Sequence, residues 1–582
     1  MRSDYTVAVI GGGASGVALA ARIVESLPAG LSTANVSIAL FDAHGCRGGN
    51  AYAADTPSNL MNTTGSAIDG GYGGDFGFLR WAGENSDKWR PLLGDRTPNP
   101  CGYVPRPVFG QYLADLLEDA RRRAPDRGMQ LDTVAEEVVD IAPPASSEQS
   151  YCIRTASGAR FEARYIYLAI GHLPRAKTED YQHREHYYHN PYPISRLIEE
   201  IPKEASVGVI GSRLTAIDVA LGLAAGGHQG TVTCVSRRGR LPAVRADQGK
   251  YQFRKLEREQ LRKHLRYRSA RLRLADVAAM LGSEIEHAEG RPVALGDIVN
   301  APASPVAYYE HEIRLAEGRA RPWQAVLYAT NRNIDLLWHH LEEEDKKLLM
   351  SEWLNDWLTY RASIPRENAE RVLALMRTGR LEVRGGAREI RYDDSTRRFN
   401  LCLGGDDTVA VEFLAAATGS ANRIENADST LTRNLLARGL VRSHRFGGVD
   451  CRFETGQVTG RNHSGADSRM FALGPITSGV YFFTTALEIV HRQASRRAED
   501  LAFMLGVDWL DLPETEEWVD ARQRVSGSRP VKPEVPSEGA PDLLERVVAG
   551  DQFDLIDFEQ LHLLNDQISS GELRRPDPEK AG

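Results

Sequence analysis

Residues Tyr5–Gly16 read YTVAVIGGGASG, and this stretch decides the fold of the first part of the chain. A short run of β-branched and apolar residues leads directly into a glycine cluster. An alanine-rich helical pattern follows, from Val17 to Ser26. The order of strand, glycine turn and helix is typical of a βαβ unit that binds a dinucleotide.

The glycines of this turn have separate expected roles. Gly11 allows the tight turn, Gly13 lets the backbone approach a pyrophosphate, and Gly16 lets helix and strand pack closely. Ala14 and Ser15 begin the helix, whose free N–H groups and partial positive charge suit an anion. A structural turn without a ligand is the alternative, because glycine-rich turns are common.

The next strand, Val36 to Phe41, ends in Asp42, an acidic residue expected to hydrogen-bond a ribose 2′-hydroxyl. A GxGxxG pattern between a strand and a helix, with an acid closing the following strand, predicts a dinucleotide site. These residues alone do not distinguish NAD from FAD.

Four later segments favour FAD. They are GGNAY at 48–52, NLMNT at 59–63, YVPRPVFGQY at 103–112 and YIYLAIGH at 165–172. The first two form a long loop after the second strand, where flavoproteins commonly run chain over the pyrophosphate and the isoalloxazine. We therefore add Tyr52, Asn62, Thr63 and Gly171 to the predicted cofactor-binding residues.

The order GGGASG, G-x-x-Y, L-x-N, P-R-x-x-x-G-x-Y and L-A-I-G-H resembles the FAD/NAD(P)-binding flavoproteins related to class B flavin monooxygenases. The resemblance covers residues 4 to about 495. It implies an α/β protein with two Rossmann-like dinucleotide-binding domains, FAD bound in a discontinuous first domain, and NADPH bound in a domain inserted into it.

A second fingerprint recurs at residues 207–218, VGVIGSRLTAID, and a strand follows from Thr231 to Val235. Its predicted nucleotide-binding residues are Gly211, Ser212, Arg213, Thr215, Ser236, Arg237 and Arg238. The second strand ends in an arginine pair rather than an acid, which suits the 2′-phosphate of NADPH. Solvated surface charges are the alternative interpretation of the pair.

Arg213 stands where the fingerprint normally has its second glycine. Two outcomes are open from the sequence. Either the guanidinium swings out and clamps phosphate, or the side chain crowds the pyrophosphate and weakens nucleotide binding.

The bulk composition fits a globular enzyme of several domains. The chain has 582 residues, 42% hydrophobic and 26% charged, with a net charge of -8 that gives no reason to expect nucleic acid. A basic stretch from Lys250 to Arg273 holds ten Lys or Arg residues; nucleic-acid binding is the alternative to a solvated helix, which we favour. No run is long and apolar enough for a membrane span, and no signal peptide is evident, so we expect a cytoplasmic protein.

The six cysteines lie far apart and show no C-x-x-C spacing. This spacing predicts neither a metal site nor the redox-active disulfide of thioredoxin-reductase-like flavoproteins.

The remaining elements follow from local patterns. We expect a strand at Val326–Ala329, a helical block at Leu336–Tyr360 and a strand at Leu381–Val383. Residues Phe413–Gly419 resemble the crossover that returns the chain to the first domain, with Thr418 and Gly419 at the cofactor. Residues Met470–Gly479, with Gly474 and Gly479, are expected to close over the flavin before a helix at Tyr481–Gln493.

These elements predict four regions. Residues 1–200 and 396–500 form the FAD domain, 201–395 the NADP domain with a helical insertion, and 501–582 a linker (526–541) with a helical tail (542–573).

The resemblance also implies a reaction. Relatives include N-hydroxylating monooxygenases of natural-product and antibiotic pathways, which use O2 and a C4a-hydroperoxyflavin, and enzymes that convert L-aspartate to nitrosuccinate. If the substrate is an acidic amino acid, arginines should bind its carboxylates, and we select Arg106, Arg245, Arg361 and Arg461. A structural salt bridge is the alternative for each. We predict no catalytic acid or base, since His172 is more typical of a capping or packing group.

Two other functions remain open. The chain could be an FAD-dependent NAD(P)H dehydrogenase or reductase of a small organic substrate, or a non-enzymatic flavin-binding protein. The oligomeric state is also open, with a homo-oligomer among the possibilities.

Overall fold

The computed structural model describes residues 3–505, apart from short segments at 28–35, 47, 73–76, 94–97, 147–148, 247–248, 268–270, 295–297, 299–303, 319, 406 and 461–467. Arg461, the expected linker and the expected helical tail lie outside the described residues.

The first sheet is built on the glycine fingerprint. Its strand order is β3-β2-β1-β6-β5-β4, with β15 also beside β6. The strands are β1 Asp4–Ile10, β2 Val36–Phe41, β3 Met129–Val134, β4 Val138–Ala142, β5 Tyr151–Thr155, β6 Arg160–Leu168 and β15 Met470–Ala472. Strands β1, β2, β3, β6 and β15 are parallel, and β4 and β5 form an antiparallel extension. The inner strands are buried on both faces, which explains their nearly continuous apolar sequence.

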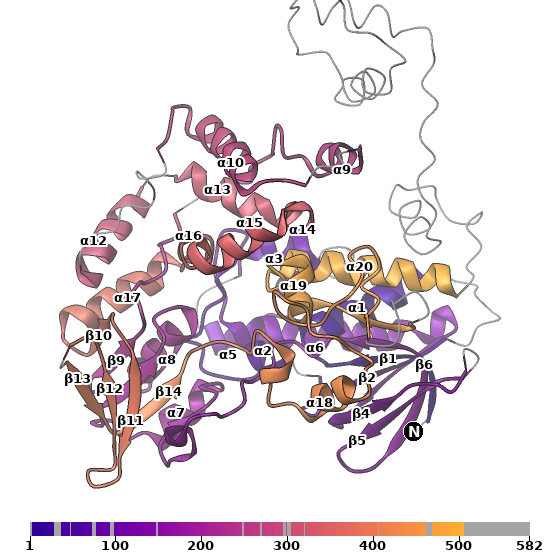
Figure 1. Ribbon diagram of the computed structural model, residues 1–582, viewed down its shortest axis with the longest axis horizontal. Helices are drawn as coiled ribbons and strands as arrows, with labels where there is room; N and C mark the ends of the chain where they lie inside the picture. The colour runs from indigo at the N-terminus through magenta and orange to yellow at the C-terminus, as the bar shows by residue number, and fades with distance from the viewer. Residues whose placement is uncertain are drawn as a thin grey trace, which may run out of the picture.

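Helices cover this sheet (Figure 1). Helix α1, Ala14–Ser26, packs against α6, Arg106–Arg123, and against α20, Leu487–Met504, so segments more than 450 residues apart lie side by side. The remaining elements around this sheet are α2 Gly49–Tyr52, α3 Gly65–Tyr72, α4 Phe78–Glu84, α5 Ser86–Leu93, α18 Thr430–Ala437 and α19 Ser478–Tyr481. The expected helix at Tyr481–Gln493 is wrong at its start. The chain breaks at Phe482, where φ is 66°, before α20 begins at Leu487.

The second sheet is parallel throughout, in the order β10-β9-β8-β14-β7. Its strands are β7 Tyr187–Tyr188, β8 Val207–Ile210, β9 Val232–Val235, β10 Leu381–Arg384 and β14 Phe413–Ala416, and its helices are α7 Ile194–Glu200, α8 Leu214–Ala225 and α17 Arg366–Arg377. A small antiparallel sheet, β11 Glu389–Asp393, β12 Arg398–Cys402 and β13 Thr408–Val411, packs on it. Two Rossmann-like sheets, one entirely parallel and one parallel with an antiparallel extension, confirm the predicted fold class.

One expected boundary is wrong. We expected residues 396–416 to belong to the first domain, with Phe413 starting the return. Strand β14 instead pairs with β8 and β7, and its apolar side chains fill the core of the second sheet. The return to the first sheet begins only after this strand.

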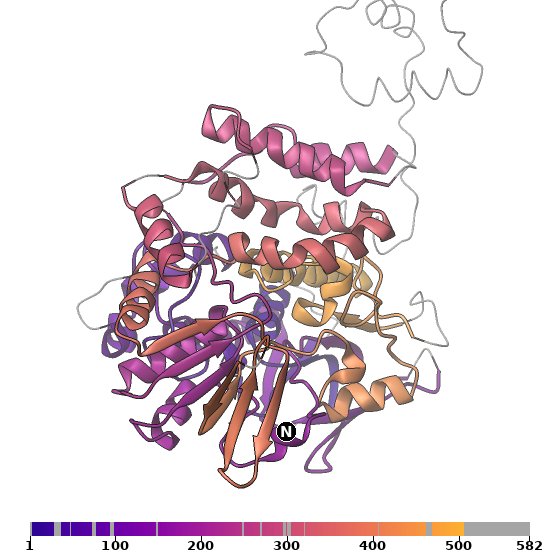
Figure 2. The same ribbon diagram turned by 60° about the vertical axis from the view of Figure 1, so that its left-hand side comes forward.

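A helical lobe lies above both sheets in Figure 2. It comprises α9 Arg258–Tyr267, α10 Leu274–Glu289, α12 Pro305–Ala316, α13 Pro322–Ala329, α14 Ile334–His340, α15 Glu343–Leu348, a π-helical turn Leu349–Trp353 and α16 Leu354–Arg361. The expected helical block at Leu336–Tyr360 is therefore confirmed. The expected strand at Val326–Ala329 is wrong, because Pro322 occupies the first helical turn and these residues complete α13.

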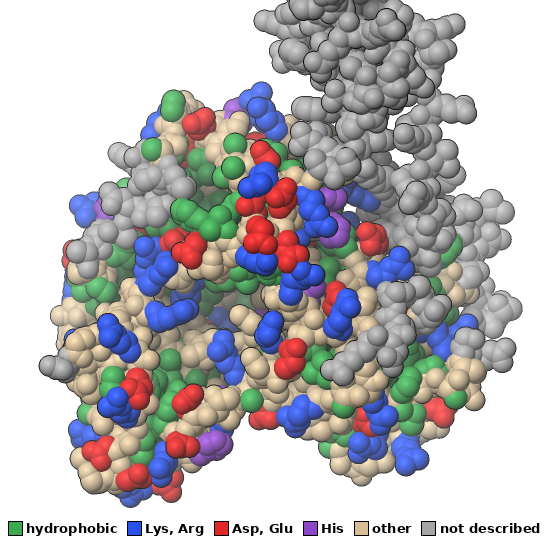
Figure 3. Space-filling view, viewed as in Figure 1, with side chains coloured by type: hydrophobic (Ala, Val, Ile, Leu, Met, Phe, Trp, Pro, Cys, Tyr) green, Lys and Arg blue, Asp and Glu red, His purple; other side chains and the backbone are tan. Residues whose placement is uncertain are grey.

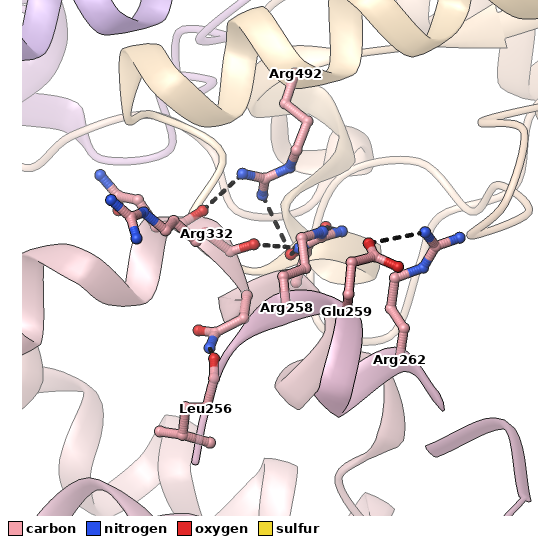
Figure 4. A network of polar contacts seen from close by, with 9 residues as sticks. Leu256, Arg258, Glu259, Arg262, Arg332 and Arg492 are labelled. Carbon is pink, nitrogen blue, oxygen red and sulfur yellow. Dashed lines mark hydrogen bonds and ion pairs between the residues drawn. The ribbon is translucent and has the colours of Figure 1, made fainter. Parts of the chain in front are cut away.

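The basic stretch is only partly the solvated helix that we expected. Arg258 is largely buried and pairs with Asp335 at 2.8 Å, and Arg492 of α20 pairs with the same carboxylate at 3.2 Å (Figure 4). These contacts fasten the lobe to the first domain. Burial raises the pKa of Asp335, but Arg492 and Arg258 lower it more, so the pKa lies well below its usual range.

Among the described residues, no helix is long and apolar enough to cross a membrane. The same part of the chain holds no cluster of His, Cys, Asp or Glu suited to a metal ion.

Candidate active site

The first glycine turn leaves its backbone donors accessible. Gly11 adopts φ +111°, and a Cβ on Gly16 would lie 1.8 Å from the Gly11 carbonyl oxygen, so both positions require glycine. A Cβ on Gly13 would meet no heavy atom nearer than 3.9 Å. No side chain caps the N-terminus of α1, which Ala14 and Ser15 begin. This open cradle of N–H groups fits a pyrophosphate.

Asp42 lies at the end of β2, where a ribose acceptor was expected. Its two carboxylate oxygens accept hydrogen bonds from the Gly12 and His44 amides, each at 2.8 Å. Each carboxylate oxygen has a further lone pair, so these bonds fix the carboxylate without preventing a contact to a hydroxyl group.

The loops after β2 bring the other expected flavin residues to this end of the sheet. Tyr52 packs edge-on against Phe109, with ring centroids 4.8 Å apart, and burial raises its pKa. The half-buried side chains of Asn62 and Thr63 make no hydrogen bond within the described residues. These two polar groups are therefore available to a ligand.

The later segments converge on the same region. A Cβ on Gly474 would lie 2.4 Å from the Ser15 hydroxyl oxygen, so the segment expected to close over the flavin touches the start of α1. The Gly479 carbonyl accepts a hydrogen bond from the Trp338 indole at 2.8 Å. The structure thus joins this segment both to the cradle and to the helical lobe.

Gly171 and Gly419 mark the two chain crossings between the sheets. Both adopt positive φ, and a Cβ at either position would meet no heavy atom within 4 Å. Beside them, His172 Nδ1 lies 3.0 Å from the hydroxyl of Ser420, which follows Thr418 by two residues. Burial lowers the pKa of His172, as suits a neutral packing group.

The second fingerprint has the same local design. The Gly211 amide donates to the Val235 carbonyl at 2.8 Å, and Ser212 lies 2.9 Å from the Ser236 hydroxyl. Thr215 lies in the first turn of α8, whose N-terminus has no side-chain cap. The turn between β8 and α8 therefore also presents free amides.

The position of Arg213 differs from both expectations. Its guanidinium points to the helical lobe and donates to the Asn355 carbonyl at 2.6 Å and to the Asn355 side-chain oxygen. Arg238, in turn, lies 3.8 Å from Asp356. Arg237 is exposed and forms no ion pair among the described residues.

Arg106 does not serve as a free substrate ligand. It forms an ion pair with the buried Asp218 at 2.8 Å, and Tyr192 donates to the same carboxylate at 2.6 Å. This pair links α6 of the first domain to α8 of the second. Arg106 therefore forms a structural salt bridge, which was the alternative interpretation for each candidate arginine.

Arg245 and Arg361 come together around one aromatic ring. Their guanidinium carbons lie 3.8 Å and 4.1 Å from the centroid of Tyr328. Both arginines are buried, at 6% and 4% exposure, and the Nε of each has no hydrogen-bond partner. In the described part of the chain, neither forms an ion pair with a carboxylate.

The surroundings of this pair come from both the lobe and the first domain. Arg245 also lies over Tyr103, 5.8 Å from the ring centroid, and Arg361 lies over Phe483 at 4.9 Å. Burial raises the pKa of Tyr328, but the two guanidinium groups lower it more, so its net pKa is below the usual value. Two positive charges are thus buried in an aromatic enclosure.

Other groups hold the two arginines in place. The Asn331 side-chain oxygen accepts from Arg361, and the Asn331 amide donates to Glu488 of α20 at 2.8 Å. Tyr328 and Asn331 were not among the predicted site residues. Tyr328 was assigned to a strand, and no local pattern singled out either residue.

Comparison with known proteins agrees with this geometry. Residues 8–173 match a family described as FAD-NAD(P)-binding. The fold is similar to that of ornithine hydroxylase from Pseudomonas aeruginosa, with a TM-score of 0.52 and 13% identity over 86% of this chain and 99% of that one. It is also similar to L-lysine 6-monooxygenase from Pseudomonas syringae, with a TM-score of 0.50 and 14% identity over 87% of this chain and 100% of that one. Comparison with curated protein sequences gives no match.

The chain therefore contains an FAD-NAD(P)-binding domain, and its overall fold is similar to that of these two enzymes. The predicted resemblance and cofactor class are confirmed.

Proposed function

We propose that this protein is an FAD-dependent, NADPH-using monooxygenase that N-oxidises the amino group of a small acidic amino acid, with L-aspartate as the specific substrate and nitrosuccinate as the final product. The first round balances as amine, O2, NADPH and a proton giving hydroxylamine, water and NADP+. Support for an oxygenase comes from the fold shared with ornithine and lysine hydroxylating enzymes.

The observation that carries the substrate assignment is the buried pair Arg245 and Arg361. Glu488 stabilises the charge of Arg361 without forming an ion pair with it, and no acidic side chain of the described residues does so for Arg245. Burying charges without a close counter-ion costs roughly several kcal/mol, so such a pair is retained where a ligand supplies the opposite charge. Two guanidinium groups match two carboxylates, and arginine binds carboxylate through two parallel hydrogen bonds. A monocarboxylate with a cationic side chain, such as ornithine, would leave one guanidinium unpaired.

The residues present fit both cofactors. The open Gly13 cradle, Ser15, Asp42, Asn62 and Thr63 would hold FAD, and the turn at Gly211 with the arginines after β9 would hold NADPH. When bound, FAD would supply the redox chemistry that couples the oxidation of NADPH to the activation of O2. The aromatic side chains of Tyr103, Tyr328 and Phe483 would keep water from the reacting amine.

We assign residues 1–186 and 420–505 to the flavin domain, and the intervening residues to the nucleotide domain with its helical insertion. An N-oxidised amino acid is a building block of natural products, antibiotics included. We propose that the enzyme acts in natural-product biosynthesis. We also propose that it is located in the cytoplasm.

The test is a substrate panel with the FAD-loaded protein. NADPH oxidation and N-oxidised product are measured with L-aspartate, L-glutamate, L-asparagine and L-ornithine. We expect product with L-aspartate and little or none with L-asparagine or L-ornithine, because of these three only L-aspartate has two carboxylates to satisfy both arginines; L-glutamate tests the effect of one additional methylene group. Product from L-ornithine but not from L-aspartate would overturn the substrate assignment, and O2-independent transfer to an organic acceptor would favour a reductase.

A further inference from the structure

Three arginines of the nucleotide domain surround one carboxylate of the helical lobe. Asp356 of α16 forms an ion pair with Arg240 and lies 3.8 Å from Arg238. Arg213, whose charge Asp356 also stabilises, donates to the neighbouring Asn355. Asn355 and Asp356, which are consecutive in α16, therefore contact three guanidinium groups.

The charges of this group do not cancel. Three arginines and one carboxylate leave a net charge of about +2, and a phosphate monoester carries about −2 near neutral pH. Arg238 and Arg240 follow β9, Val232–Val235, where this fold places the ribose 2′ group of the nucleotide. Figure 3 shows a hollow between the helical lobe and the second sheet, with Lys and Arg side chains on its rim. The anion suited to this group is therefore the 2′-phosphate of NADPH.

We infer that Asp356 occupies the 2′-phosphate site of the free protein and that NADPH displaces it, so that Asp356 weakens NADPH binding and reduces the preference for NADPH over NADH. NADPH regains the lost ion pairs through its phosphate. NADH has no 2′-phosphate. It therefore leaves the ion pairs between Asp356 and the arginines in place. This inference rests on the proposed function, since it assumes that the second fingerprint binds the nucleotide.

The helix that carries Asp356 also reaches the substrate site. Arg361, at the other end of α16, lies five residues further on, about 7.5 Å along a helix axis. A π-helical turn, Leu349–Trp353, precedes α16. A π-helical turn contains one more residue than an α-helical turn, and such turns are frequent at functional sites. Displacement of Asp356 is thus transmitted to Arg361 through one short helix.

The test measures nucleotide binding to the FAD-loaded protein by isothermal titration calorimetry, using NADP+ and NAD+ in place of the reduced forms. Asp356→Asn removes the competing charge, and Asn355→Ala frees Arg213 without changing any charge. Glu310→Gln is the matched control, because it removes an exposed ion pair, Arg377–Glu310 at 2.8 Å, elsewhere on the lobe. Flavin content and thermal unfolding confirm that each variant is folded.

We expect Asp356→Asn to bind NADP+ about threefold to tenfold more tightly, as for the release of one or two partly exposed ion pairs. Binding of NAD+ should change less than twofold, and Glu310→Gln should match the wild type. NADP+ should also alter the Kd of L-aspartate in the wild type but not in Asp356→Asn. Unchanged or weaker NADP+ binding in Asp356→Asn, or an equal gain for NAD+, would overturn the inference alone. A wild-type protein that binds no NADP+ would overturn the proposed nucleotide site as well.

Discussion

Replacing Arg245 by methionine should separate stability from substrate binding. The substitution removes a buried charge that has no carboxylate partner within the described residues, while keeping most of the side-chain volume. It loses cation–π contacts with Tyr328 and Tyr103, about 2 kcal/mol. Burial lowers the pKa of Arg245, but Tyr328 and Tyr103 raise it more, so these two rings already offset the cost of burying the charge. The free energy of unfolding should therefore fall by no more than the cation–π contribution, about 2 kcal/mol.

Substrate binding should weaken more than stability does. A buried contact between a guanidinium and a carboxylate contributes about 2–4 kcal/mol when one partner is removed, which corresponds to a roughly 30-fold to 900-fold higher KM for L-aspartate. The assay combines thermal unfolding of the FAD-loaded protein with initial rates of product formation. NADP+ binding serves as a check that the nucleotide site is intact.

Arg321→Met is the matched control. Arg321 is also buried, but it forms a bidentate pair with Glu312 at 2.7 Å and 3.0 Å. Removing it leaves Glu312 unpaired and should cost about 3–5 kcal/mol of stability. If Arg245→Met loses as much stability as Arg321→Met and keeps the wild-type KM, then Arg245 is structural and the dicarboxylate argument fails.

Further predictions concern the cradle and the interdomain contacts. Gly13→Ala should fold normally but retain less FAD, because its Cβ would meet no heavy atom nearer than 3.9 Å and would enter the space left for the pyrophosphate. Gly16→Ala should instead destabilise the fold, because its Cβ would lie 1.8 Å from the Gly11 carbonyl oxygen. Flavin absorbance per protein and thermal unfolding distinguish the two variants, and wild-type FAD retention in Gly13→Ala would contradict the proposed pyrophosphate cradle. Asp335→Asn should cost about 3–5 kcal/mol at neutral pH by leaving Arg258 and Arg492 unpaired. Because the folded pKa of Asp335 is lowered, its stabilisation is complete above the ordinary carboxyl pKa of about 4 and is lost as the pH falls below it. Chemical denaturation at several pH values should show that acid-side loss in the wild type and not in Asp335→Asn.

Much of the fold could be predicted because its signals are local. The strand, glycine turn and helix at Tyr5–Ser26 need only neighbouring residues, and the apolar run Val207–Ile210 repeats the same pattern. Val326–Ala329 was misassigned, since four apolar residues fit a strand or a buried helix equally well. Only the preceding Pro322 and the packing of the lobe decide for a helix.

The sites depend on contacts that sequence spacing does not contain. Arg245 and Arg361 were selected as separate candidates, and their meeting at Tyr328 arises from folding of the lobe over the sheets. The sequence predicts Arg106 as a substrate ligand on the same grounds as Arg245 and Arg361, yet the buried Asp218 neutralises its charge. The same holds for Arg213, whose partner Asn355 is 142 residues away.

The most direct test of the account is mass spectrometry of the products formed from L-aspartate, NADPH and isotopically labelled O2 by the FAD-loaded protein. We predict an N-oxidised aspartate product that carries the heavy oxygen on nitrogen, formed with consumption of NADPH. NADPH consumption that yields only hydrogen peroxide, with L-aspartate recovered unlabelled and intact, would contradict the central claim.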